Sequence, residues 1–318
     1  MRKLNYLNAN LVSHVEHNLN RQINVMTIDC EDWFHGLEIG IESWHKYERR
    51  IEGSVNKLLE LFKNSDTKAT FFILGNLAEE FPQLVKRIAD AGHEIGSHGY
   101  SHQFVYKLSP EEFKSEMLRT NEILYKITGQ PVVSFRAPYF SITRQSLWAL
   151  DILHEVGIVY DSSIFPVINY RYGIPEAFRM PHWIMTPKGS KIFEFPASTI
   201  KIGGKNVPVG GGAYFRIFPY AFTKMGLKHL NRSRRPGMFY LHPWELDPKQ
   251  PQIDLPFRIK LTHYWNLHRT EQKFKKLLND FQFIPFKDVI NYEERSKEIK
   301  LLPHHFHKQE EQSILKSV

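Results

Sequence analysis

Two stretches of the chain carry residue types that could bind a divalent metal together. His98 and His102 lie four residues apart among glycines and serines, and two imidazoles at that spacing can reach one cation. Well upstream, Asp29, Glu31 and Asp32 follow a short apolar run. Carboxylates this close repel one another unless a cation or an arginine compensates them. The pattern therefore favours a metal site over a solvated acidic turn.

Short apolar runs alternate with segments of helical spacing along most of the chain. Strands are predicted over residues 23–28, 68–74, 93–97, 132–135, 158–160, 192–195 and 238–241. Helices are predicted over residues 53–64, 82–91, 110–128, 143–156, 219–230 and 270–281. This alternation predicts a parallel sheet or barrel with crossover helices.

Several polar residues follow a predicted strand directly: Asp29, His98, Arg136, Asp161 and His242. Because the carboxyl ends of parallel strands share one face, we expect these side chains to lie near one another. Taken singly, Arg136 could form a structural salt bridge, and His242 could be a satisfied strand-end histidine. Together they indicate an active site on that face.

The composition is that of a soluble globular protein, with 42% hydrophobic and 24% charged residues in a chain of 318. The formal net charge is +8, but no basic cluster alternates with aromatic residues, so we expect no nucleic-acid partner. We find no long apolar run for a membrane span and no apolar core for a signal peptide. With one cysteine, Cys30, we expect a cytoplasmic protein without disulfides. Peripheral contact with the inner membrane stays open.

Some remaining segments are assigned no chemistry. The glycines of residues 203–204 and 210–212 lack a phosphate-loop pattern, so we expect a close-packed turn or a substrate-facing loop. Cys30 sits among acids, which disfavour a thiolate. The histidines of residues 304–307 are expected in a tail. We divide the chain into an N-terminal arm (1–22), a catalytic domain (23–246) and a C-terminal extension with one helix and a charged tail (247–318).

The order of these motifs resembles that of the polysaccharide deacetylase family, the family 4 carbohydrate esterases with a NodB homology domain. The family pattern combines an acidic strand end, H-x-x-x-H, R-x-P-[YF], an aspartate and Leu-His. Here these elements lie at residues 29–31, 98–102, 136–139, 161 and 241–242, within a similarity that runs from Ile23 to Glu245. The stretches 29–35, 160–166 and 240–245 look like the exopolysaccharide-locus branch, which carries a DUF3473-type C-terminal extension.

This resemblance implies an α/β fold, a distorted (β/α) barrel of about seven parallel strands with outer helices. It implies one divalent metal, most often Zn²⁺, with Co²⁺, Ni²⁺ or Mn²⁺ as alternatives. The implied reaction removes N-acetyl groups from amino sugars of a bacterial exopolysaccharide or cell-wall glycan. The implied partner is thus a carbohydrate.

The metal ligands implied by the resemblance are one carboxylate and the histidine pair. The commonest family form has two adjacent aspartates, whereas Cys30 takes the second place here. Alternate residues of a strand share a face, so Glu31 points with Asp29 and Asp32 points away. We therefore assign Glu31 to the metal with His98 and His102, and keep Asp32 as the alternative ligand.

The resemblance also implies catalytic roles. Asp29 would act as general base, oriented and kept ionised by Arg136. His242 would protonate the departing amine, with Asp161 holding its ring charged and oriented. The backbone N–H of Tyr139 would help to stabilise the oxyanion.

Aromatic residues near these motifs are candidates to stack on sugar rings, namely Trp33, Phe34, Tyr139, Trp183 and Trp244. Core packing explains each of them equally well. Two other functions stay open as well. A related amidohydrolase acting on a small or cyclic amide would have a narrow, closed pocket, and a non-catalytic glycan-binding protein would lack a complete acid–base pair.

Overall fold

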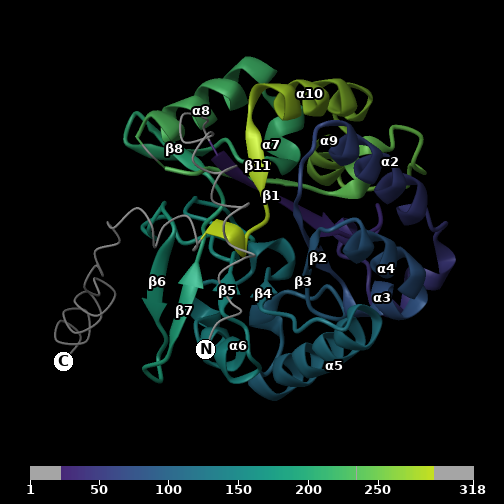
Figure 1. The fold of residues 1–318 in the computed structure, drawn as a ribbon, viewed down its shortest axis with the longest axis vertical. Coiled ribbons are helices and arrows are strands. Elements are labelled where there is room, and N and C mark those ends of the chain that lie inside the picture. Colours follow the sequence, from purple (N-terminus) through teal and green to yellow (C-terminus); the bar gives the residue numbers. More distant parts are fainter. Residues whose placement is uncertain (1–22, 234, 290–318) are drawn as a thin grey trace, which may run out of the picture.

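One curled, mostly parallel sheet forms the centre of the fold (Figure 1). The computed structural model describes residues 23–233 and 235–289. Within them the strand order is β10-β1-β2-β3-β4-β5-β7-β6, with β11 paired to β1 and β6 antiparallel to β7. The strands are β1 (Ile23–Cys30), β2 (Thr70–Ile73), β3 (Glu94–Ser97), β4 (Ser134–Phe135), β5 (Tyr160–Asp161), β6 (His182–Met185), β7 (Lys191–Glu194), β10 (Met238–Leu241) and β11 (Gln282–Ile284). The distorted α/β barrel that the family resemblance implies is confirmed, and the strand order shows that it is only partly closed.

Strand β1 lies at the centre of the site-bearing half of the sheet. All its residues from Asn24 to Cys30 are buried, as expected for a parallel strand covered on both faces. It pairs with β10 on one side and with β2 on the other. The carboxyl ends of β1, β3, β4 and β10 therefore meet at one edge, where the polar residues begin.

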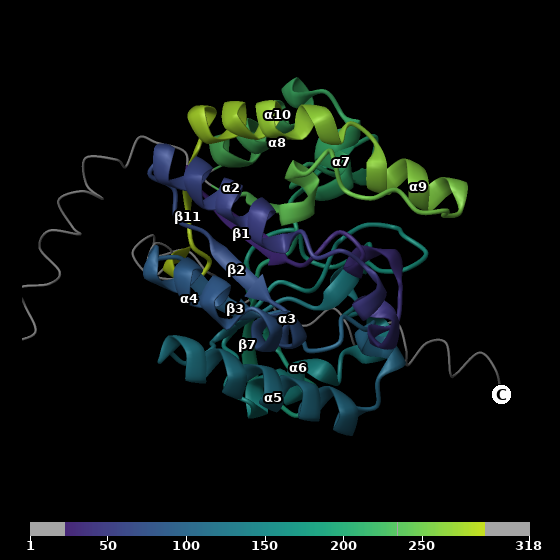
Figure 2. The same ribbon diagram turned by 90° about the vertical axis from the view of Figure 1, so that its right-hand side faces the viewer.

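Helices pack around the outside of the sheet, and Figure 2 shows α10, α2, α4 and α5 one below another along it. They are α2 (Ile51–Asn64), α3 (Gly75–Glu80), α4 (Pro82–Asp90), α5 (Pro110–Thr128), α6 (Ala149–Glu155), α7 (Gly212–Ile217), α8 (Tyr220–Arg232), α9 (Phe257–Tyr264) and α10 (Leu267–Asp280). Helix α5 starts at a Ser109–Glu112 capping box, as its sequence indicates. The helix predicted from residue 143 begins later, because Thr143 caps a short 3₁₀ turn over residues 144–146.

Glycines let the chain pass close to β10. Gly211 has φ 127° and forms a parallel bridge with Tyr240. A Cβ at this position would lie against the Tyr240 carbonyl oxygen, so a larger residue would push the two segments apart. The close-packed turn expected for residues 210–212 is present. A two-stranded hairpin, β8 (Thr199–Ile202) and β9 (Lys205–Pro208), precedes it.

The described part of the C-terminal extension packs into the same core. Strand β11 pairs with residues 23–25 of β1, ahead of the stretch that pairs with β2. Phe274 of α10 is fully buried and its ring meets those of Phe239 and Phe62. The arm over residues 1–22 and the tail with its histidines lie outside the described residues.

Phe274→Ala should destabilise the whole fold by about 3–5 kcal/mol, because it opens a cavity between α10 and the sheet. Urea unfolding followed by tryptophan fluorescence measures this. Lys276→Ala, at an exposed position of the same helix, should change the free energy of unfolding by less than about 0.5 kcal/mol. A separate early transition in Phe274→Ala, with the main one unmoved, would show that the extension unfolds independently.

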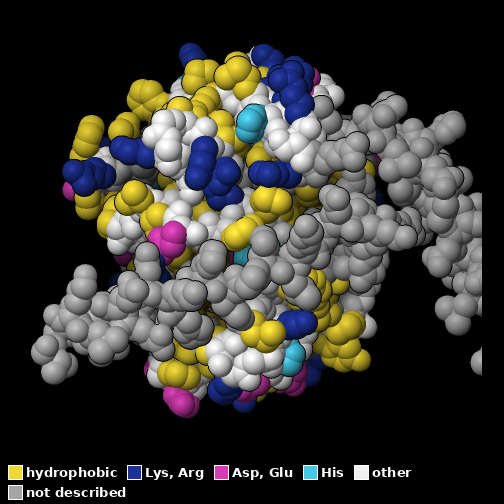
Figure 3. All heavy atoms as spheres, turned by 90° about the vertical axis from the view of Figure 1, so that its left-hand side faces the viewer, with side chains coloured by type: hydrophobic (Ala, Val, Ile, Leu, Met, Phe, Trp, Pro, Cys, Tyr) yellow, Lys and Arg dark blue, Asp and Glu magenta, His cyan; other side chains and the backbone are white. Residues whose placement is uncertain are grey.

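Positively charged side chains are unevenly distributed on one face of the molecule. Lys and Arg side chains gather on the upper part of the face in Figure 3, where few acidic side chains are visible. Such a field attracts anionic partners. Among the described residues no helix is long and apolar enough to cross a membrane.

Candidate metal and catalytic site

Glu31, His98 and His102 converge at the carboxyl ends of β1 and β3. One ligand atom from each lies within 4.8 Å of the others, and all three residues are buried. Glu31 Oε2 is 2.5 Å from His102 Nε2 and 3.9 Å from His98 Nε2. The structure thus brings together the three residues that the sequence assigns to a metal.

The surroundings of these residues fit a divalent cation. His98 Nδ1 donates to the Arg136 carbonyl at 2.8 Å, which leaves the Nε2 lone pair free for a metal. Burial lowers the pKa of His98 to about 4, so the ring is neutral. Glu31 Oε1 accepts from Trp244 Nε1 at 3.1 Å. Its Oε2 is buried, and no described N–H points to it in hydrogen-bond geometry. A cation would satisfy that oxygen.

Asp32, the alternative ligand, is engaged elsewhere. Its Oδ2 accepts from the backbone N–H groups of Arg50 and Ile51 at 2.8 and 3.2 Å, and its Oδ1 accepts from Trp33 N at 2.9 Å. The carboxylate therefore caps the start of α2. Burial raises its pKa to about 6 against the effect of these hydrogen bonds. Its assignment as a possible ligand is not supported by this geometry.

Asp29 is held by a fully buried arginine. Arg136 Nη1 donates to Asp29 Oδ1 at 2.9 Å and to Thr27 Oγ1 at 2.9 Å. Nε and Nη2 of Arg136 donate to the carbonyl and hydroxyl oxygens of Ser162 at 3.0 and 2.8 Å. The contact expected between Asp29 and Arg136 is present. Because Arg136 engages Oδ1, Oδ2 is left to face the cavity.

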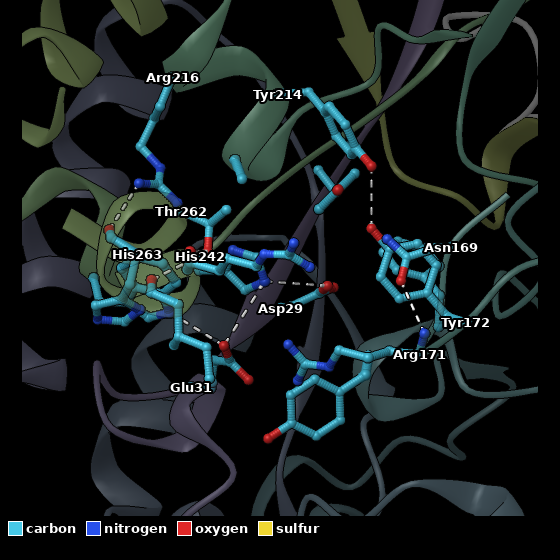
Figure 4. Close-up of a pocket in the computed structure, with 18 of the residues that line it drawn as sticks. Asp29, Glu31, Asn169, Arg171, Tyr172, Tyr214, Arg216, His242, Thr262 and His263 are labelled. Atoms are coloured by element: carbon cyan, nitrogen blue, oxygen red, sulfur yellow. Dashed lines mark hydrogen bonds and ion pairs between the residues drawn. The ribbon is translucent and has the colours of Figure 1, made fainter. Parts of the chain in front are cut away.

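His242 approaches the carboxylates of Asp29 in β1 and of Glu31 just after it (Figure 4). Its Nε2 lies 3.8 Å from Asp29 Oδ2 and 3.7 Å from Glu31 Oε1. Burial would lower the pKa of His242, but Glu31, Glu245 and Asp29 together raise it to about 9. The imidazole is therefore protonated at neutral pH, as a general acid must be.

The carboxylate behind His242 is Glu245, so the prediction that Asp161 orients this ring is wrong. His242 Nδ1 donates to Glu245 Oε1 at 2.7 Å, and Arg216 Nε donates to Glu245 Oε2 at 2.5 Å. His242 and Arg216 hold the pKa of Glu245 at about 2 despite its burial. Asp161 instead accepts a hydrogen bond from Ser163 Oγ.

Local geometry explains this exchange. After β10 the chain enters a 3₁₀ helix over Pro243–Leu246, which brings residue 245 back to the side of residue 242. The sequence signal is the i, i+3 spacing of His and Glu in His-Pro-Trp-Glu. That spacing is informative only once a helical turn is recognised there.

Glu31, His98 and His102 line a cavity of about 430 Å³. One wall carries the predicted residues Asp29, Glu31, His98, His102, Tyr139, His242 and Trp244. The other walls come from segments to which the sequence assigned no role: residues 169–172, residues 213, 214, 216 and 217 at α7, and residues 258, 259 and 261–263 of α9. Tyr172 and Tyr214 meet through their hydroxyl groups at 3.2 Å on one side of it (Figure 4).

The predicted sugar-stacking residues divide into two groups. Trp244 and Tyr139 line the cavity. Trp33 and Phe34 do not, because their rings are buried against Tyr47 and neighbouring aromatic side chains. Trp183, on β6, packs against the ring of Phe193 and is also absent from the cavity lining. Packing therefore accounts for Trp33, Phe34 and Trp183, and sugar contact at these residues stays a prediction.

Tyr139 has an unusual backbone for a residue with a side chain. Its φ is 57°, and its hydroxyl donates to the His35 carbonyl at 2.8 Å. The Arg171 guanidinium lies 4.8 Å from the centre of its ring. Such left-handed conformations persist where surrounding contacts impose them, often at functional sites. The proposed role of its backbone N–H stays a prediction.

Comparison with known proteins identifies the family. Residues 45–159 match the family model for polysaccharide deacetylases, and residues 162–291 match a domain of unknown function, DUF3473. Residues 45–159 thus carry a polysaccharide deacetylase domain, followed by a DUF3473 domain. A stretch of 96 residues is 43% identical to peptidoglycan-N-acetylglucosamine deacetylase of Bacillus cereus. This match covers 30% of the chain and 35% of that protein, so the chain spans about a third of its length.

Solved structures agree on the fold of this chain. A putative polysaccharide deacetylase from Mycobacterium smegmatis has a TM-score of 0.60 and 16% identity, and the match covers 89% of this chain and 93% of that one. PuuE allantoinase has a TM-score of 0.58 and 17% identity over the same shares. At these identities the likeness concerns the fold. The site itself uses both matched regions, since His98 and Arg136 lie in the first and His242 in the second.

His98→Ala, His102→Ala and Glu31→Gln should each abolish stoichiometric binding of Zn²⁺, because each removes one of the three converging ligand atoms. Metal content after dialysis, measured by mass spectrometry, tests this. Asp32→Asn should largely retain the metal, since that side chain caps α2. Loss of metal in Asp32→Asn together with retention in Glu31→Gln would reverse the assignment.

Glu245→Gln should lower the pKa of the His242 imidazole from about 9 toward the ordinary value near 6.5, because it removes the charge at Nδ1. An NMR titration of the ring in the metal-free protein measures the shift directly. Asp161→Asn should leave this pKa within about half a unit. The opposite ranking of the two variants would restore Asp161 as the partner of His242.

Proposed function

We propose that this chain is a metal-dependent hydrolase that removes N-acetyl groups from amino sugars of a bacterial polysaccharide and releases acetate. The observation that supports the proposal is that Asp29 and His242, two groups able to transfer protons, lie beside the proposed metal-binding residues. Asp29 Oδ2 and His242 Nε2 lie 3.8 Å apart, and His242 Nε2 is 3.7 Å from the metal-binding carboxylate of Glu31. A glycan-binding protein without catalysis needs no such acid–base pair.

Glu31, His98 and His102 would hold the metal. When bound, a divalent cation such as Zn²⁺ polarises an amide carbonyl and makes water more acidic. The burial of these residues excludes bulk water, which strengthens every charge interaction at the site.

Asp29 and His242 would divide the proton transfers between them. Arg136 fixes Asp29 through Oδ1, so Oδ2 can take the proton of the attacking water. His242, charged and held at Nδ1 by Glu245, can give its Nε2 proton to the departing amine. The Tyr139 N–H is proposed to donate to the oxyanion that forms between these steps.

The cavity suits a short glycan segment. Its volume of about 430 Å³ lies in the range of small-ligand sites, and Tyr139 and Trp244 offer aromatic surface beside the metal ligands. An exopolysaccharide or cell-wall glycan is the proposed substrate class. The alternative is hydrolysis of a small or cyclic amide. Assays with a panel of substrates distinguish it from deacetylation of a glycan.

Exposed apolar side chains at the cavity mouth support peripheral contact with a membrane. Tyr170, Ile217 and Leu261 line the cavity and are 82%, 41% and 41% exposed. The neighbouring Ile168 and Phe257 are 83% and 78% exposed. Apolar side chains grouped on a surface are typical of interaction sites. Contact at the inner membrane, and the cytoplasmic location, stay predictions.

Asp29→Asn should reduce turnover to near background, because the amide keeps the shape of the side chain but cannot accept the water's proton. Acetate release from chitooligosaccharides, exopolysaccharide fragments and peptidoglycan, together with ring opening of a small cyclic amide, measures both the activity and its substrate class. Metal content and glycan binding should match those of the parent. The parent and the variant are compared at equal metal occupancy.

Several outcomes would change this proposal. An active Asp29→Asn protein, or one that loses its metal, would show that the roles of base and ligand are exchanged. A parent enzyme that releases product from the cyclic amide and none from the glycans would favour the alternative. A metal-loaded parent that binds glycans without releasing acetate would indicate a binding protein.

A further inference from the structure

Asp161 and Glu194 form a buried pair of carboxyl groups that the proposed mechanism does not use. They are register partners on the neighbouring parallel strands β5 and β7, so their side chains leave the sheet side by side. Both residues are 0% exposed. Two ionised carboxylates placed together without water repel strongly, so the structure must compensate them.

In each carboxyl group of the pair, one oxygen accepts a hydrogen bond and the other has no donor within the described part of the chain. Asp161 Oδ1 accepts from Ser163 Oγ at 2.5 Å, and Glu194 Oε1 accepts from Ile164 N at 3.1 Å. Asp161 Oδ2 and Glu194 Oε2 are buried and have no donor among the described residues. A single proton between these two oxygens would satisfy both and remove one charge.

We propose that Asp161 and Glu194 share one proton, and that this pair positions the Arg136–Tyr139 turn of the active site. Asp161 thereby acts on the general base and the proposed oxyanion donor, and it does not act on His242. The proton sharing stands on the geometry of the pair. The positioning role rests on the proposed deacetylase function.

Two neighbouring serines connect the pair to the turn. Ser163, which donates to Asp161, accepts from the Ala137 N–H at 2.8 Å. Ser162, one residue earlier, binds the Arg136 guanidinium through its carbonyl and hydroxyl oxygens. The turn held in this way ends in Tyr139, with its left-handed backbone.

The charged groups around the pair do not replace the proton. Arg136, after β4, directs its described hydrogen bonds to Thr27, Asp29, Ser162 and Met238. His182 of β6 is the register partner of Glu194, but its Nδ1 bonds the Met180 carbonyl, and burial lowers its pKa. Asp151 of α6, which packs on β7, accepts from Lys188 N. Burial raises the pKa of Asp161 to about 6 and that of Glu194 well above its ordinary value, in keeping with one retained proton.

Glu194→Gln tests the shared proton without any assay of activity. The glutamine amide donates to Asp161 Oδ2 permanently, whereas the parent must take up a proton on folding at any pH above the unfolded pKa of glutamate, about 4.3. The parent therefore loses stability as the pH rises, and the variant does not. The ratio of unfolding constants, parent over variant, should rise by up to about tenfold per pH unit between roughly pH 5.5 and 8.

Urea unfolding of the two proteins at matched metal content measures this ratio. A ratio that stays constant over that range would overturn the shared proton. This result does not depend on whether the chain is a deacetylase, so it separates failure of the proton sharing from failure of the proposed function.

Glu194→Leu tests the positioning role. It removes the donor and leaves Asp161 without its partner, so the turn should shift and kcat should fall by about 10²-fold. KM should stay within about twofold, because Glu194 is absent from the cavity lining. Glu194→Gln should retain most of the turnover that Glu194→Leu loses. Equal kcat in the two variants, with both folded and metal-loaded, would overturn the positioning role.

Discussion

A fully buried guanidinium is the constraint on which the candidate site depends. Arg136 is 0% exposed, and a charge removed from water is tolerated only when partners surround it. The Asp29 carboxylate supplies the opposite charge, and Thr27 and Ser162 accept from its remaining N–H groups. These contacts join the ends of β1, β4 and β5 at one point. Asp29, the proposed general base, is thus placed by the same interaction that makes Arg136 tolerable in the core.

From this ion pair, charges of alternating sign continue across the site. Asp29 and Glu31 face His242, His242 bonds Glu245, and Glu245 bonds Arg216. Each carboxylate has a cation on either side, or would have one once a metal binds at Glu31. The alternation explains why His242 is protonated at a pH where an isolated histidine is neutral. It also explains why Glu245 stays ionised although it is buried.

The sequence predicts the helices and strands better than the side-chain contacts of the residues that follow the strands. Apolar runs ending in Asp29, Arg136 and His242 indicate strands whose ends share a face, because burial and strand alternation are local properties. The partner of His242 depends on a turn of 3₁₀ helix after β10, and the choice between Asp161 and Glu245 requires three-dimensional positions. Trp33 lies beside the acidic cluster, and its position in the sequence suggests contact with a sugar. In the structure its ring packs against Tyr47 and points into the core.

Neither matched region contains all residues of the candidate site. The first supplies the histidine pair and Arg136, whereas β10, the proposed general acid His242 and the wall formed by α9 come from the second. Within the second region, Trp244 donates to Glu31, the proposed metal ligand just after β1, while its ring stacks on His263 of α9. A change in α9 can therefore affect the Glu31 carboxylate through the indole of Trp244. The second region determines both the shape of the cavity and the orientation of the carboxylate at its base.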